Sequence, residues 1–138
     1  MTAHRIMIID DEKIVGDMSK FSLEQDGYVV ETFLNGESAL ERLKQEKFSV
    51  VITDLKMKEI YGLEILRTVK QLYPGTAVIM ITVFANLDVA IEAFRDYVHD
   101  FFPKPFKIKD LKESIKRALA KAAIPGDGNC WRIGIRFP

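Results

Sequence analysis

The chain has 138 residues, a length typical of a single domain. Hydrophobic residues make up 48% of it and charged residues 29%, a balance that excludes an intrinsically disordered chain. The 20 Lys and Arg residues equal the 20 Asp and Glu residues in number, and this zero net charge argues against direct binding to nucleic acid. The one cysteine, Cys130, excludes an intrachain disulfide and a cysteine zinc site.

The beginning of the chain does not have the pattern of a secretory signal, because the apolar run of residues 6–9 stops at Asp10. The longest strongly apolar stretch, residues 77–85, is far shorter than the about 20 residues that a membrane-spanning helix needs. The single cysteine also suits a reducing compartment. We therefore predict a cytoplasmic protein without membrane contact.

Short apolar runs rich in β-branched residues recur along the chain. They lie at residues 5–9, 28–33, 48–53, 77–81 and 98–102. Several of these runs are apolar without alternation, which is typical of strands whose two faces are both covered by helices. The runs therefore predict five strands of a parallel sheet.

Apolar residues at helical spacing fill the segments between these runs. The first pattern places Ile14, Met18 and Phe21 at i, i+4 and i+7, and Gly27 marks its end. Further apolar stripes follow within residues 39–43, 63–69, 89–94 and 111–122. Alternating strands and helices predict a (βα)5 domain of the α/β class, a three-layer sandwich with right-handed crossovers.

The composition changes after Ala123. Residues 124–129 have the Pro, Gly and Asn content of a linker, and residues 130–138 alternate large apolar side chains with basic or small ones. We predict a domain over residues 1–123 and a short C-terminal tail over residues 124–138 that is too short to be an effector domain. The alternation suggests that the tail packs on a sheet edge, either of this chain or of a neighbouring one.

Polar residues follow the predicted strands. Asp10 and Asp11 follow the first, Asp54 the third, Thr82 the fourth and Lys104 the fifth. Ligands of open parallel sheets bind outside the carboxyl ends of the strands, so these residues are the candidate site. Clustered carboxylates repel one another, and Mg²⁺ removes that penalty. An ionised carboxylate can also attack phosphorus, provided that donors surround the transferred group.

Five motifs in order resemble the receiver domain of bacterial two-component response regulators. They are residues 8–12 (Ile-Ile-Asp-Asp-Glu), 51–57 (Val-Ile-Thr-Asp-Leu-Lys-Met), 62–64 (Gly-Leu-Glu), 80–82 (Met-Ile-Thr) and 100–106 (Asp-Phe-Phe-Pro-Lys-Pro-Phe). The resemblance covers about residues 5–121. It implies a flavodoxin-like fold with the strand order 2-1-3-4-5.

The resemblance implies a phosphorylation site that needs Mg²⁺. Asp54 would accept a phosphoryl group from the phosphohistidine of a histidine kinase or a phosphotransfer protein. Asp11 and Asp54 would bind the metal together with the backbone carbonyl of Lys56, and Asp10 would act mostly through a metal-bound water.

Further roles follow from the same resemblance. Thr82 and Lys104 would bind phosphoryl oxygens, and Phe101 would be the aromatic residue that turns inward when Thr82 moves. The peptide bond between Lys104 and Pro105 is expected to be cis.

The implied function is a phosphorylation-controlled switch in two-component signal transduction. Its output would pass through the surface of helix four, strand five and helix five, and a homodimer through this surface is expected. Such a domain catalyses its own phosphotransfer and autodephosphorylation, but its main role is signalling. The sequence leaves open whether the protein is a stand-alone receiver or part of a longer regulator.

Three positions depart from the usual receiver pattern. Lys58 stands where the family usually has Pro, and Tyr97 stands where it usually has Gly near the end of helix four. Val83 replaces a small residue after Thr82. Its β-branched side chain, together with Phe84, is expected to slow the attack of water on an aspartyl phosphate.

Other interpretations compete with a phosphorylated receiver. A flavin-binding module would need a hydroxyl-rich and glycine-rich phosphate loop where Asp10 and Asp11 stand. A hydrolase of the haloacid dehalogenase type would need a second Asp where Lys56 stands. A receiver-like interaction module that is not regulated by phosphorylation is the main alternative, and Asp10 and Asp11 would then simply cap the first helix. We interpret His4 and His99 as structural or surface groups.

Overall fold

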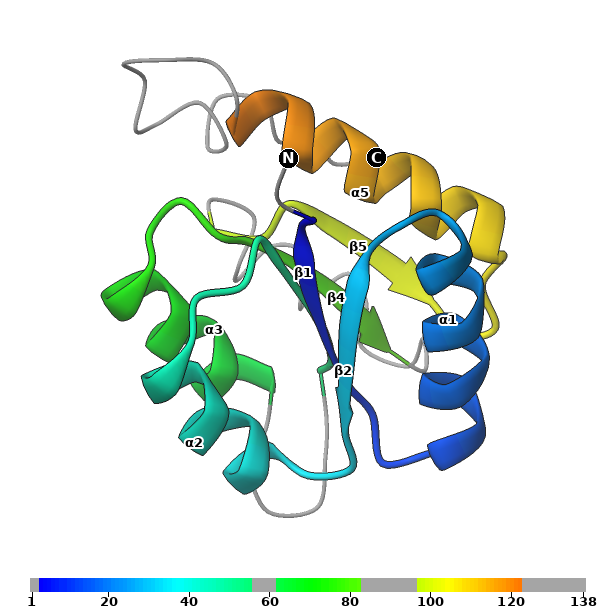
Figure 1. The fold of residues 1–138 in the computed structure, drawn as a ribbon. Helices are drawn as coiled ribbons and strands as arrows, with labels where there is room; N and C mark the ends of the chain where they lie inside the picture. Colours follow the sequence, from blue (N-terminus) through cyan, green and yellow to red (C-terminus); the bar gives the residue numbers. More distant parts are fainter. Residues whose placement is uncertain (1–2, 56–61, 83–96, 123–138) are drawn as a thin grey trace.

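The computed structural model describes residues 3–55, 62–82 and 97–122 (Figure 1). Its centre is one sheet of five parallel strands in the order β2-β1-β3-β4-β5, as the resemblance implied. The strands are β1 (Arg5–Ile9), β2 (Val29–Phe33), β3 (Val50–Asp54), β4 (Ala77–Thr82) and β5 (Asp100–Pro103). The predicted strands agree with these bounds to within two residues.

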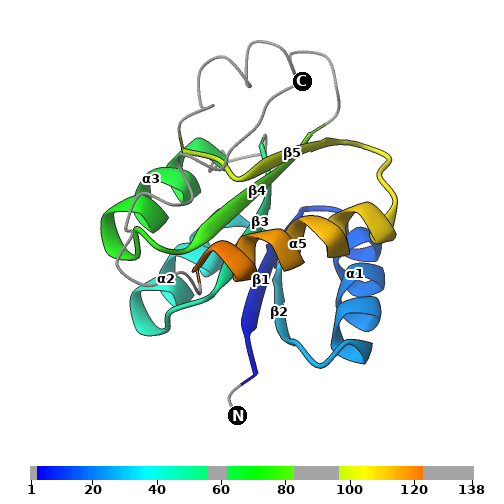
Figure 2. The same cartoon turned by 90° about the horizontal axis from the view of Figure 1, so that it is seen from above.

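Helices cover both faces of the sheet. They are α1 (Lys13–Gln25), α2 (Gly36–Gln45), α3 (Gly62–Leu72) and α5 (Ile108–Ala122). Figures 1 and 2 show α1 and α5 on one face and α2 and α3 on the other. The flavodoxin-like three-layer sandwich is therefore confirmed.

Two apolar clusters form the core, one on each face of the sheet. Alternate residues of one strand enter different clusters, because successive side chains of a strand point to opposite faces. In β1, for example, Met7 and Ile9 pack with α2 and α3, whereas Ile6 and Ile8 pack with α1 and α5. Both sets are buried, which explains why the strands are apolar without alternation.

Helix α1 does not bury the apolar stripe that the sequence suggested. Ile14, Met18 and Phe21 are 68%, 66% and 67% exposed. The buried residues of α1 are instead Gly16, Ser19 and Leu23. A Cβ atom at Gly16 would lie 3.7 Å from the side chain of Thr32 in β2, so small residues on this side let the helix approach the sheet closely.

Some predictions fall outside the described residues. These are the helix expected between β4 and β5, the tail of residues 124–138, and the domain end at residue 123. Within the described part of the chain, no helix is long and apolar enough to cross a membrane.

Candidate functional site

Backbone hydrogen bonds beyond the strand ends fix the site residues in space. The N–H of Asp10 donates to the carbonyl of Phe33 at 3.0 Å, which holds the residue after β1 against β2. The N–H of Lys104 donates to the carbonyl of Thr82 at 2.8 Å, so β5 delivers Lys104 beside the end of β4. In register, Asp54 lies opposite Ile81, directly before Thr82. The parallel sheet thus gathers the predicted residues at one edge.

Gly62 lets α3 begin against the backbone of the candidate phosphoacceptor. Its N–H donates to the carbonyl of Leu55 at 2.8 Å. A Cβ atom at this position would lie 2.5 Å from the carbonyl oxygen of Asp54 and 2.9 Å from Leu55 Cα. No side chain fits there without a shift of backbone, so the close approach requires glycine.

Three of the predicted carboxylates form an acidic cluster. Asp10, Asp11 and Asp54 each offer an oxygen atom within 4.8 Å of the others. Asp10 and Asp54 are buried, whereas Asp11 is exposed. Like charges at this distance favour either protonation or a bound cation.

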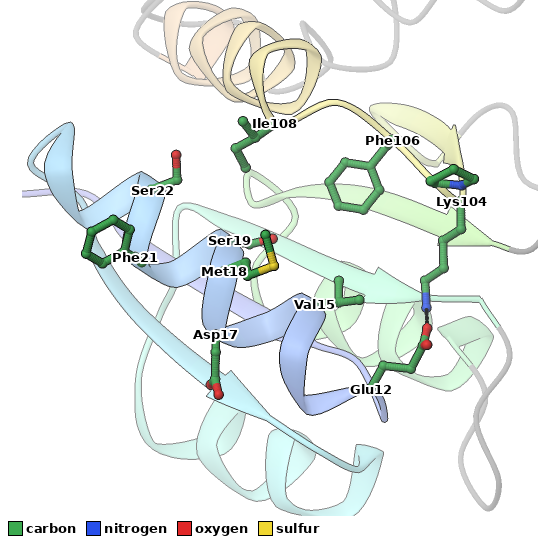
Figure 3. A pocket seen from close by; sticks show the side chains of 11 residues that line it. Glu12, Val15, Asp17, Met18, Ser19, Phe21, Ser22, Lys104, Phe106 and Ile108 are labelled. Carbon is green, nitrogen blue, oxygen red and sulfur yellow. Dashed lines mark hydrogen bonds and ion pairs between the residues drawn. The ribbon is translucent and has the colours of Figure 1, made fainter.

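Lys104 supplies one cation to this cluster. Its Nζ lies 2.8 Å from Asp54 Oδ2 and 2.9 Å from Asp10 Oδ2. It also lies 2.8 Å from Glu12 Oε1. An ammonium has three N–H donors, so these three carboxylates match its donor capacity. Figure 3 shows the contact with Glu12, which lies across the mouth of a groove between α1 and the segment after β5.

Burial and the ammonium act in opposite directions on the acidic cluster. Burial raises the pKa of Asp10, although the N–H of Glu12 and the Lys104 ammonium partly offset this rise. The hydrogen bond to Lys104 lowers the pKa of Glu12. Burial by itself would lower the pKa of Lys104, but its three carboxylate partners outweigh burial and raise it. Lys104 is therefore charged throughout the physiological pH range.

The two carboxyl oxygens of Asp10 have different surroundings. Its Oδ1 accepts the N–H of Glu12 at 2.8 Å and contacts Lys104 Nζ at 3.2 Å. Its Oδ2 is buried and accepts no hydrogen bond within the described residues, although the Lys104 ammonium is its ion-pair partner. With the neighbouring oxygens of Asp11 and Asp54, this donor set fits a hard divalent cation such as Mg²⁺.

The other predicted site residues lie close by. Thr82 is buried at the end of β4. Phe101 is half-buried and packs against the cluster under α2 and α3, whereas Phe102 packs on the opposite face of the sheet. The bond between Lys104 and Pro105 is cis, as expected. Lys56, Val83 and Phe84 lie outside the described residues.

The exposed apolar side of α1 lines a groove that begins at this site. The groove has a volume of about 900 Å³, and its walls come from α1 and from the segment that joins β5 to α5. Met18 and Phe21 lie along it, and Glu12 and Lys104 close one end (Figure 3). An apolar surface therefore continues directly from the charged cluster.

Sequence reasoning missed two residues of the site. Glu12 belonged to a recognised motif but had no role, and Lys104 contacts it across 92 positions of the chain. A third acidic residue after Asp10 and Asp11 was the available signal. Gly62 was also part of a motif without a role, and the signal was a glycine at the start of a helical pattern.

The fold and this charged edge match one known family. Residues 6–116 match the family model of the response regulator receiver domain. This match spans well over half of the chain, so the protein belongs to the response regulator receiver domain family, whose members act in two-component signalling.

Individual relatives agree with this assignment. The response regulator receiver protein CpdR of Brucella abortus is 37% identical over 123 residues, which cover 86% of this chain and 98% of CpdR. A CheY-like receiver domain protein from Methanospirillum hungatei, whose structure is solved, is 30% identical in sequence. The two structures align with a TM-score of 0.84 over 91% of this chain and 100% of that protein's chain.

Several curated relatives are much longer. The DNA-binding transcriptional regulator NtrC of Escherichia coli is 30% identical over 115 residues, which make up 83% of this chain but only 24% of NtrC. The chain thus spans about a quarter of the length of these relatives.

Proposed function

We propose that this protein is a phosphorylation-controlled receiver in which Asp54 accepts the phosphoryl group. The observation that carries the proposal is the ammonium of Lys104, which lies 2.8 Å from Asp54 and 2.9 Å from Asp10 at the carboxyl ends of the strands. A buried carboxylate beside a cation can act as a nucleophile, and the same cation stabilises charge on the transferred group.

The chemical step is a transfer between two side chains. A carboxylate oxygen of Asp54 attacks the phosphorus of a phosphohistidine, an oxygen–phosphorus bond forms and the phosphorus–nitrogen bond breaks. The electron pair of the broken bond stays on the departing imidazole, which takes a proton from solvent. Lys104 binds an oxygen of the phosphoryl group, and the hydroxyl group of Thr82 binds another. When water attacks the phosphorus of the aspartyl phosphate, its bond to the Asp54 oxygen breaks. Inorganic phosphate leaves, and the carboxylate of Asp54 is restored.

Mg²⁺ is the proposed cofactor. Members of this family use Mg²⁺ in phosphorylation. Asp11 and Asp54 would hold it with the carbonyl of Lys56, and Asp10 would contribute mostly through a water molecule. When bound, the metal supplies positive charge to the phosphoryl oxygens. The acidic cluster and the buried Oδ2 atom of Asp10 support this assignment.

The proposed partners are a phosphodonor and an output target. The donor is a histidine kinase or a phosphotransfer protein, and the apolar groove along α1 adjoins the site that such a protein has to reach. The proposed output surface is formed by helix four, β5 and α5, of which helix four lies outside the described residues, and Phe101 would respond to Thr82. A homodimer through this surface is part of the proposal. The main alternative is a receiver-like module that works without phosphorylation.

The test is the intact mass of the protein after incubation with Mg²⁺ and acetyl phosphate. We expect the wild type to gain about 80 Da, the mass of one phosphoryl group. Asp54→Asn should gain nothing, because an amide oxygen is a poor nucleophile. EDTA should suppress the gain in the wild type.

A matched control is Asp110→Asn, which removes an exposed aspartate from the first turn of α5. This variant should be modified like the wild type. Modification of Asp54→Asn, or full modification in EDTA, would contradict the proposal. A wild-type protein that is never modified would favour the module that works without phosphorylation.

A further inference from the structure

Lys104 has to exchange a partner when the site is phosphorylated. Within the described residues its ammonium already contacts the carboxylates of Asp54, Asp10 and Glu12. An ammonium has three N–H donors, and a phosphoryl oxygen needs one of them. Because phosphorylation turns Asp54 itself into an acyl phosphate, the carboxylates that still compete with the phosphoryl oxygens for Lys104 are those of Asp10 and Glu12.

These two carboxylates differ in how easily they can be released. The side chain of Asp10 is 2% exposed, whereas that of Glu12 is 58% exposed. A buried carboxylate that loses its cation stays poorly solvated, which is unfavourable. Glu12 regains contact with water as soon as it leaves, so its release is the easier of the two.

The position of Glu12 leaves its side chain available for this exchange. Glu12 is the N-cap residue of α1, but its side chain makes no capping hydrogen bond. Its backbone N–H, in contrast, donates to Asp10 Oδ1 and keeps the residue at the site. In Figure 3 the side chains of Glu12 and Lys104 point toward each other from opposite sides of the groove mouth.

We propose that Glu12 is a positioning residue that occupies the Lys104 N–H which a phosphoryl oxygen takes over. This inference rests on the proposed function. Glu12 holds Lys104 at the site while Asp54 is unmodified and competes with the phosphoryl group for the ammonium. The phosphorylated state therefore forms at the expense of this contact, and Glu12 lowers the affinity of the site for a phosphoryl group.

The experiment measures the affinity for beryllofluoride, a noncovalent mimic of the phosphoryl group, by calorimetry in saturating Mg²⁺. We expect Glu12→Gln to bind it about two- to fivefold more tightly than the wild type, the range that corresponds to an exposed ion pair. The amide keeps the shape of the side chain without its charge. A gain in affinity is an effect that damage to the fold would not produce.

Asp17→Asn is the matched control. Asp17 lines the same groove and its side chain is 52% exposed, but it pairs with Lys13 at 2.6 Å instead of Lys104. The substitution Asp17→Asn removes one negative charge, as Glu12→Gln does. We expect its affinity for beryllofluoride to lie within about 1.5-fold of the wild type, because exposed charges are screened. Equal effects of both variants, or an unchanged or weaker affinity of Glu12→Gln, would overturn the inference. Wild-type protein that binds no beryllofluoride would instead contradict the proposed function.

Discussion

His99 is a buried histidine whose pKa is lowered in the folded protein. It precedes β5 and is 5% exposed. Its Nε2 donates to the carbonyl of Ser114 at 3.0 Å, and its Nδ1 has no hydrogen-bond partner within the described residues. Burial lowers the pKa of His99; the cations of Lys121 and Arg117 act in the same direction, whereas Ser114 and Asp100 oppose them. A proton on Nδ1 would be a buried donor without an acceptor.

This environment predicts a loss of stability in mild acid. The folded pKa of His99 lies below the ordinary histidine value of 6.5, so the unfolded state binds more protons in this range. The contribution of His99 is fully present above about pH 6.5 and declines as the pH falls toward the folded pKa. The free energy of unfolding in urea should fall from pH 7.5 to pH 5, and His99→Gln should remove this part of the slope. Parallel slopes in both proteins would contradict the assignment.

The environment of Lys104 is determined by residues that are distant in the sequence. Its sequence context would suit a solvated surface lysine, yet its side chain is 11% exposed because β5 places it between two buried carboxylates. Its charge compensates the clustered acids. The same residue therefore serves the stability of the resting state and the binding of a phosphoryl group in the proposed function.

The connection between β3 and α3 depends on a close backbone approach. We expect Gly62→Ala, at the start of α3, to lower the free energy of unfolding by about 1–3 kcal/mol, the usual cost of an overpacked position. The Cβ atom would meet the backbone of Asp54 and Leu55, so the rate of phosphorylation by acetyl phosphate should fall as well.

Gly75→Ala is the control for this prediction. Gly75 has no neighbouring atom within 4 Å of its added Cβ and does not have a positive φ. Its replacement should leave the rate of phosphorylation unchanged and raise the free energy of unfolding by about 0.4–1 kcal/mol, because the unfolded chain loses freedom. Equal stability of the two variants in urea would show that the approach at Gly62 is not tight.

In helix α1, the spacing of the apolar residues predicted the helix but not the side that packs on the sheet. The spacing of Ile14, Met18 and Phe21 indicated a helix correctly, but a stripe at helical spacing does not say which side meets the sheet. The helix buries Gly16 and Ser19 instead, since small side chains permit a close approach to β2. Met18 and Phe21 then line the groove next to the site, and Ile14 stays exposed on the helix.

Much of the fold followed from the sequence for a physical reason. Strands that are covered on both faces are continuously apolar, and the alternation of strands with helices leads to a parallel sheet. The strand order needed the resemblance, because local patterns do not specify which strands are neighbours. The carboxylates and Lys104 were found since each follows a strand, whereas the contact between Glu12 and Lys104 depends on tertiary structure alone.

In the whole molecule, a continuous set of contacts joins the site to α5. The backbone N–H of Lys104 donates a hydrogen bond to the carbonyl of Thr82, and Lys104 directly follows β5, which begins at Asp100. Asp100 Oδ2 accepts hydrogen bonds from Ser114 Oγ at 2.7 Å and from Arg117 at 3.0 Å, both in α5. Asp100 thus links β5 to α5 directly, whereas α2 lies on the other face of the sheet (Figure 1).

This arrangement predicts where activation is felt. Beryllofluoride and Mg²⁺ should shift the backbone amide NMR signals of Phe101, Ser114 and Arg117 as well as those around Asp54. The signals of Glu37 and Glu41 on the exposed side of α2 should change least, because neither residue belongs to the apolar cluster that Phe101 packs against. A ligand moves the equilibrium between two states only by its differential affinity for them, so Phe101→Ala should reduce the shifts in α5 while beryllofluoride still binds. Shifts that remain confined to the surroundings of Asp54 in the wild type would contradict an output through β5 and α5.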